Sequence, residues 1–344
     1  MKYSGIGGQA VMEGVMMRNG DKYAIAVRKP DQEIIVEKKE YKGIANSKWA
    51  KVPLVRGVIS FVDSLVLGMS TLMFSASFFE EEEEEQPKKK KGKQAEEKVL
   101  TKEEIKKAEA KAAKQEKAMM TGVMVVAIIL AVAIFMILPY YLSAALQKVV
   151  DNQTVVAIFE GVIRLVIFIA YILLISRMKD IQRVFMYHGA EHKCINCIEH
   201  GLDLNVENVK KSSKEHKRCG TSFLVFVVVI SIILYLFIRV DSHALKVIIR
   251  ILLIPVIAGV SYELLRAAGR YNNPIINLLS KPGLWMQQLT TKEPDEDMIE
   301  VGIASVEAIF DWKAYQKENF GKEFPEESVV SEEVAVEPEP VVEE

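Results

Sequence analysis

The chain has little histidine and little cysteine, and the first residues of the sequence are not an apolar run. Of its 344 residues, only five are histidine and three are cysteine, so a place where these residues gather is informative. The first eight residues, MKYSGIGG, contain no apolar core region of the kind that a secretory signal requires. We therefore expect that insertion into a membrane is directed by internal segments.

Two stretches lack a balanced mixture of charges. Residues 80–85 are six consecutive glutamates, residues 88–91 are four lysines, and the tail after Phe324 carries eight glutamates and no lysine or arginine. Runs of like charge cannot bury a core. We therefore predict a charged linker at 80–118 and a disordered acidic tail at 322–344. Both could recruit protein partners, and we expect no nucleic-acid partner.

Long apolar runs are what the chain has in excess. It is 50% hydrophobic and 26% charged, and its mean hydropathy lies just above zero, which is typical of a membrane protein with polar loops. Four runs reach the roughly 17 to 25 residues that span a bilayer: 119–146, 155–175, 222–238 and 245–265. The third is rich in valine and isoleucine, but a lone strand in lipid would leave its backbone unpaired. The predicted fold class is therefore mainly α, a polytopic membrane protein with about four transmembrane helices in a domain at 119–268.

The basic residues of the loops predict the orientation. Nine lysines and arginines lie in residues 177–218, whereas the loops at 147–154 and 239–244 hold one each. By the positive-inside rule, both termini, the linker and the loop at 177–221 are cytoplasmic. The same rule places the C-terminal region at 269–321 in the cytoplasm, and we predict that it is helical, because residues 299–310 repeat at helical spacing.

The N-terminal third contains a fifth apolar segment, at 54–79. Arg56 and Asp63 interrupt it, and a full crossing would place the lysine-rich region before it outside, so we expect a re-entrant or interfacial helix pair. The preceding region, 1–53, contains two strand patterns, at 23–28 and 33–37, which predict a small β-hairpin. The opening GIGGQAVMEGVMMR is either a backbone loop that approaches a ligand or a tight turn before the first strand.

The stretch YHGAEHKC, at residues 187–194, contains the pattern H-x-x-E-H. On a helix, His188 and His192 lie one turn apart on the same face, with Glu191 beside them. Two imidazoles at this spacing can bind one metal ion, and the glutamate can act as a general base. The alternative is a wet interfacial helix face without a metal.

The same loop holds four of the five histidines. His216 and Cys219 lie just before the third apolar run, so either of them, or Glu199, could complete a three-ligand site with an open position. The rival arrangement is a closed structural zinc site of Cys194, Cys197, His216 and Cys219. A disulfide between Cys194 and Cys197 is disfavoured in the reducing cytoplasm. Spacing alone does not separate the open site from the closed one.

Four stretches in order closely resemble the YqhQ-like family, bacterial membrane proteins of unknown function described as predicted metal-dependent enzymes. They are GGQAVMEGVMMR, YHGAEHK, HKRCGTSFL and PGLWMQQLTTKEPD, and the resemblance covers nearly the whole chain apart from the linker and the tail. It implies a bacterial plasma-membrane location. It also argues against the closed cysteine site, since the family pattern does not require Cys194 and Cys197, and it leaves as the common set His188, Glu191, His192, His216 and Cys219.

Charged residues also occur in the apolar runs. Glu160 and Arg164 are spaced i, i+4, and Arg250 lies near the outer end of the fourth run; we interpret them as an ion pair and a snorkelling arginine. Glu263 and Arg266 lie at the cytoplasmic end of the same run, on the side of the histidine loop.

Two functions of different classes follow. The first is a membrane enzyme with a hydrolase-like site at the cytoplasmic surface, in which His188, His192, His216 and Cys219 bind a divalent metal, zinc by its chemistry, and Glu191 is the base. The second is a non-catalytic scaffold or regulator whose histidine and cysteine loop is structural. A transporter is disfavoured because the ionisable residues gather at the membrane surface.

Overall fold

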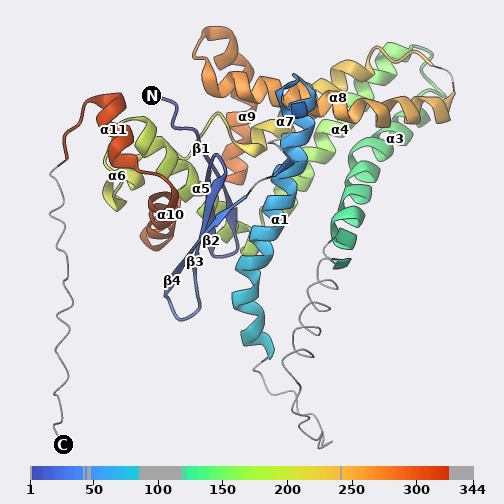
Figure 1. Cartoon of the computed structure of the whole chain (residues 1–344). Coiled ribbons are helices and arrows are strands. Elements are labelled where there is room, and N and C mark those ends of the chain that lie inside the picture. Colours follow the sequence, from blue (N-terminus) through green and yellow to red (C-terminus); the bar gives the residue numbers. More distant parts are fainter. Residues whose placement is uncertain are drawn as a thin grey trace, which may run out of the picture.

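A computed structural model describes residues 2–324 except 42, 45–47, 85–117, 120 and 241. The predicted linker from residue 85 and the predicted tail from residue 325 lie outside the described residues. Figure 1 shows a small sheet beside a set of long helices, with the sheet enclosed between helices of different parts of the chain. The prediction of a mainly helical chain with about four apolar spans and N-terminal strands is confirmed.

The N-terminal strands form a four-stranded antiparallel sheet in the order β1-β2-β3-β4. The strands are β1 (Ile6–Val11), β2 (Gly14–Asn19), β3 (Lys22–Arg28) and β4 (Ile34–Glu40). The predicted hairpin is the β3–β4 pair, and the sheet is larger because the glycine-rich opening forms β1 and β2. The interpretation of that opening as a loop or a turn before the first strand is wrong; the turn lies at Met12 and Glu13, where Glu13 has a φ of 47°.

Both faces of the sheet are covered, and alternate residues of β2 point to opposite faces. Val15 and Met17 pack into a core with α5 (Lys179–Glu199), α6 (Val206–Lys211), α10 (Glu296–Ile309) and α11 (Trp312–Phe320). Met16 packs on the other face, against Leu67 of α1. The sheet therefore holds α1 on one side and the motif helix α5 on the other (Figure 1).

The segment at 54–79 is not a helix pair. It belongs to one continuous helix, α1 (Val55–Glu84), whose part Val55–Phe79 is long and apolar enough to cross a membrane. The charges that interrupt the sequence pattern are paired within the protein: Arg56 binds Glu263, and the buried Asp63 accepts a hydrogen bond from Arg18 at 3.2 Å. These partners are distant in sequence, which is why the pattern alone indicated a break.

The predicted spans form helices. Three are long enough to cross a membrane: Thr121–Leu146, α4 (Gln153–Ile175) and α8 (His243–Arg270). The first contains a π-helical turn, η3 (Ala133–Ile137), which is followed by the final segment α3 (Leu138–Leu146). Pro139 lies in the first turn of α3. The predicted third span, at 222–238, is the shorter apolar helix α7 (Gly220–Tyr235), which packs against α8 and against α9 (Pro274–Thr290).

The intramembrane charges form a network and not a snorkelling side chain. Glu160 accepts hydrogen bonds from Arg164 at 2.8 Å and from Arg250 at 2.7 Å, so the predicted i, i+4 pair is present. Arg250 is 4% exposed and crosses from α8 to α4 instead of reaching for the surface. The prediction of a snorkelling side chain is therefore wrong for Arg250, because a buried arginine needs a carboxylate partner and Glu160 provides one.

The region after the last span begins with a helix whose position the local sequence pattern did not indicate. The stretch with Asn-Pro and Lys-Pro-Gly forms α9 (Pro274–Thr290). Asn273 caps the helix by accepting from Ile276 N, and Pro274 occupies the first turn, where a missing N–H is harmless. This helix brings residues 287–290 to the N-terminal end of α7, beside the motif helix.

Candidate metal centre

The α5 helix divides the YHGAEHKC motif between two faces. His188, Glu191 and His192 face the junction with the start of α7, whereas Cys194 and Cys197 point into the apolar core below the sheet. Cys194 lies against Gly302 of α10, at which an added Cβ would be 2.9 Å from its Sγ. The three motif residues are therefore separated from the nearby cysteines by the helix itself.

Both motif histidines are fixed by backbone carbonyl groups. His188 Nδ1 lies 3.0 Å from Thr290 O, and His192 Nδ1 lies 2.6 Å from Lys214 O. A carbonyl oxygen only accepts, so each Nδ1 donates a proton, and in the neutral ring Nε2 is the free acceptor. This is the arrangement by which neighbouring groups orient histidines that bind a metal through Nε2. His192 Nε2 is buried and has no hydrogen-bond partner among the described residues.

Cys219 completes a compact group. It caps α7, where its Sγ accepts from Thr221 N at 3.3 Å, and the same Sγ lies 3.2 Å from His188 Nε2. One ligand atom from each of His188, His192 and Cys219 lies within 4.8 Å of the other two. Among the described residues, this is the group of histidine, cysteine and acidic side chains whose spacing could hold a metal ion.

The electrostatics favour the thiolate form of Cys219. Burial raises the pKa of Cys219. The charges of His188 and His192 together have a larger, opposite effect, so the pKa of Cys219 lies well below its usual value. Burial lowers the pKa of His188, but the Cys219 thiolate and Glu191 raise it to about 9. Without a metal, the two side chains therefore form a thiolate–imidazolium pair. The thiolate is also the form in which cysteine binds metals.

Glu191 lies beside the two histidines of this group. Its Oε2 is 3.8 Å from both His188 Nε2 and His192 Nε2, and the residue is 5% exposed. Gly8 of β1 lies directly against it, since an added Cβ at Gly8 would be 2.9 Å from Glu191 Cγ and 2.6 Å from Met16 O. The glycine-rich opening therefore lets the sheet approach the motif glutamate.

His216 and Glu199, the other candidate ligands, lie just beside the group. The ring of His216 is 5.6 Å from that of His192, and its buried Nε2 faces Glu199 Oε2 at 3.7 Å. Burial lowers the pKa of His216. Glu199 is held by Arg218 and by Ser4 at 2.8 Å. Burial opposes its charge, but the contacts with His216 and Arg218 hold its pKa at about 2.

The closed cysteine site does not form. Cys194 and Cys197 are fully buried in the apolar core, where burial raises the pKa of each thiol, to about 11 for Cys197. Neither belongs to the group that contains Cys219, although all these residues are described. Cys197 instead donates to the carbonyl of Asp203 at 3.4 Å. The α5 helix thus directs Cys194 and Cys197 away from Cys219, so the four residues of the closed zinc site are not brought together.

The four motif stretches meet at this place. Gly8 contacts Glu191, the α5 and α7 motifs supply the group, and the last stretch supplies the Thr290 carbonyl that holds His188. The sequence reasoning missed Gln287, which is fully buried and bonds the backbone N and O of His216, both at 2.8 Å, and the hydroxyl of Ser222. Its position within PGLWMQQLTTKEPD was the signal that could have found it.

Comparison with known proteins agrees with these motifs. A family model described as "Protein of unknown function (DUF1385)" matches residues 52–312. An uncharacterized protein, YqhQ, of Bacillus subtilis (strain 168) is 33% identical over 317 residues, which cover 91% of this chain and 94% of that protein. No solved structure matches. The resemblance to YqhQ-like proteins is thus confirmed, and the chain belongs to the DUF1385 family.

Proposed function

We propose that this protein is a metal-dependent membrane enzyme with a hydrolase-like site at the cytoplasmic surface. In this proposal, His188, His192 and Cys219 hold a divalent metal, which we assign as zinc because two imidazoles and one thiolate suit that ion. The observation that carries the proposal is the orientation of the two histidines. Both are fixed at Nδ1 by carbonyl oxygens, His188 Nε2 lies 3.2 Å from Cys219 Sγ, and one ring nitrogen of His192 lies within 4.8 Å of both partners' ligand atoms.

Each protein group has a role in the proposed reaction. Three protein ligands leave one position for water or substrate, and the metal would lower the pKa of water bound there. Glu191, whose carboxylate is 3.8 Å from both histidine nitrogens, takes the proton from the attacking water and returns it to the leaving group. We leave His216 outside the ligand set, because its Nε2 faces Glu199 and it is not part of the compact group.

Metal analysis and complementation test this proposal together. Detergent-purified wild type should contain zinc near one ion per chain, and His188→Ala should lose it, because a site with two protein ligands binds far more weakly. Glu191→Gln should keep the metal. In a deletion strain whose phenotype the wild-type chain restores, Glu191→Gln should fail at matched expression, since loss of a general base costs about 10² to 10⁴ in rate. Full complementation by Glu191→Gln would remove its catalytic role.

A structural metal is the second candidate, and burial favours it. His192 is 1% exposed and Cys219 is 5% exposed, and together they tie the motif helix α5 to the start of α7. A metal there would act as a fixed link in a scaffold. In that case Glu191→Gln would be nearly silent, and His192→Ala would lower the melting temperature and the expression level together.

A further inference from the structure

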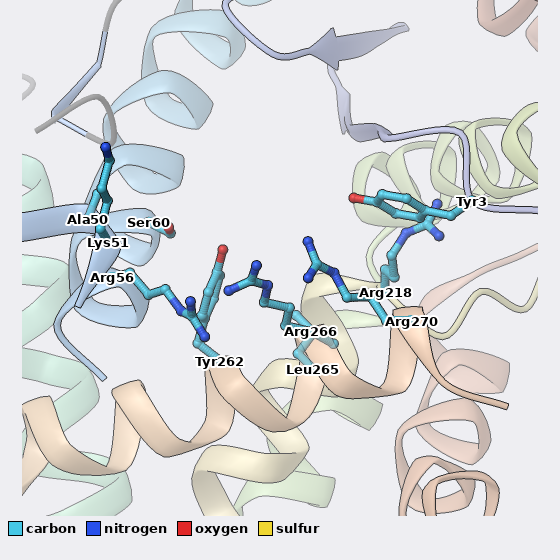
Figure 2. A pocket seen from close by; sticks show the side chains of 10 residues that line it. All are labelled: Tyr3, Ala50, Lys51, Arg56, Ser60, Arg218, Tyr262, Leu265, Arg266 and Arg270. Carbon is cyan, nitrogen blue, oxygen red and sulfur yellow. The ribbon is translucent and has the colours of Figure 1, made fainter. Parts of the chain in front are cut away.

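A basic cavity is lined by Arg218, the residue directly before Cys219. It has a volume of about 610 Å³, within the range of ligand pockets. Figure 2 shows its walls: Arg266 and Arg270 project side by side from α8, and Arg218 with the ring of Tyr3 stands at one end. Lys51, Arg56 and Ser60 stand at the other end.

The positive charge of this cavity is not balanced by the residues that line it. Five of the lining side chains are cationic, and none is acidic. Arg56 is paired with Glu263, and Arg218 is paired with Glu199. Among the described residues, Lys51, Arg266 and Arg270 form no close ion pair of their own, although the charge of Arg266 also acts on Glu263. The cavity therefore has three cations without a close carboxylate, at exposed or half-buried positions that a ligand can reach.

The arrangement of these cations suits a phosphate group. Tyr262, Arg266 and Arg270 are spaced by four residues on α8, which places them on one helix face. Arginine presents a planar set of donors that matches phosphate oxygens in pairs, and Ser60 and Tyr262 add hydroxyl donors at the wall. We propose that this cavity binds a phosphate-bearing ligand.

The position of the cavity allows two sources of that phosphate. It lies at the C-terminal end of α8, a helix long enough to cross a membrane, and at the N-terminal end of α1. Basic pockets at such helix ends bind the headgroups of anionic lipids, and a soluble phosphate compound offers the same chemistry. Binding does not require a metal, because none of the three residues of the metal group lines the cavity.

The test measures binding to the full chain in phosphatidylcholine nanodiscs. Calorimetric titration with inorganic phosphate probes a soluble ligand, and native mass spectrometry after exchange with phosphatidic acid probes a lipid. The test variant is Arg266→Gln, Arg270→Gln. The matched control is Arg177→Gln, Lys179→Gln, which removes the same charge from exposed positions outside the cavity.

We expect the test variant to bind at least tenfold more weakly than wild type, while the control binds like wild type. If the test variant loses only the binding of phosphatidic acid, the ligand is a lipid headgroup. If it loses only the binding of inorganic phosphate, the ligand is a soluble compound. Absence of both from wild type, or equal binding by wild type and test variant, overturns the proposal. Arg270→Gln alone, at an exposed position, should weaken binding if the double variant does not fold. His188→Ala should still bind the phosphate ligand, so a failure of the metal proposal can be distinguished from a failure of this one.

Discussion

At the scale of the residue, the three buried cysteines allow a matched test of the metal group. Cys219→Ala should abolish metal binding, because it removes the only thiolate of the group, whereas Cys194→Ala should retain the metal. Both side chains are buried, so both changes should lower the free energy of unfolding, by about 1 kcal/mol for a small core truncation. The measurement is metal per chain by mass spectrometry beside the melting temperature. Metal loss in Cys194→Ala would favour the closed cysteine site.

Glu199 gives a prediction for the pH dependence of stability. Its pKa falls from the ordinary 4.5 to about 2 in the folded protein, because His216 and Arg218 outweigh the effect of burial. A lowered folded pKa stabilises the protein above pH 4.5, and that stabilisation, on the order of 3 kcal/mol, is lost as the pH falls toward 2.

Thermal unfolding of metal-free protein between pH 6 and 2 tests this prediction. The melting temperature of wild type should fall below about pH 4.5. Glu199→Gln should melt lower at pH 6, because Arg218 loses its carboxylate, and should depend less on pH within this window. Parallel curves for wild type and Glu199→Gln would show that Glu199 does not carry the effect.

At the scale of the element, the sequence predicted helices well and the sheet incompletely. The apolar runs and the face shared by His188 and His192 follow from local spacing, so both were accessible. The β1 strand could not be predicted, because its glycines locally indicate a turn. The reason for a glycine at position 8 is the close contact with Glu191, which is distant in sequence. Likewise the position of α9 within the predicted helical region was missed, because Pro274 and Pro282 suggest breaks. The contacts of Gln287 with His216 join residues 71 apart, which no local pattern contains.

Gly189 controls how closely the connection between α9 and α10 lies on α5. An added Cβ would be 2.0 Å from Lys292 O, a backbone atom that cannot move alone. Gly189→Ala should therefore shift residues 290–292 and with them the Thr290 carbonyl that fixes His188. We expect weaker metal affinity, by 10-fold or more as for the loss of an orienting partner, and a lower melting temperature.

Gly220→Ala is the matched control for this element. Gly220 follows Cys219 at the start of α7, and an added Cβ there meets no atom within 4 Å. The variant should therefore bind metal like wild type in a competition titration with a chelator. Equal affinities for all three proteins would mean that the α9–α10 connection does not position His188.

At the scale of the whole molecule, the sheet constrains the path of α1. By length and composition, Val55–Phe79 could cross a membrane. Its C-terminal half, however, lies along the sheet: Gln9 donates to the Thr71 hydroxyl at 2.6 Å, and Met12 N donates to Ser75 at 3.1 Å. The opposite face of the same sheet packs on α5. Because a sheet with polar edges remains in water, we predict that both ends of α1 lie on the side of the histidine loop.

Cysteine labelling in cells tests this path. The native cysteines are buried, so introduced ones report without strong background. Lys48→Cys and Ser77→Cys, before and near the end of α1, should react with an impermeant maleimide only after permeabilisation, and Asp151→Cys, in the short loop before α4, should react in intact cells. If α1 crossed the membrane, Lys48→Cys and Ser77→Cys would label from opposite sides. That result would overturn the predicted path, in which both ends of α1 lie on the side of the histidine loop.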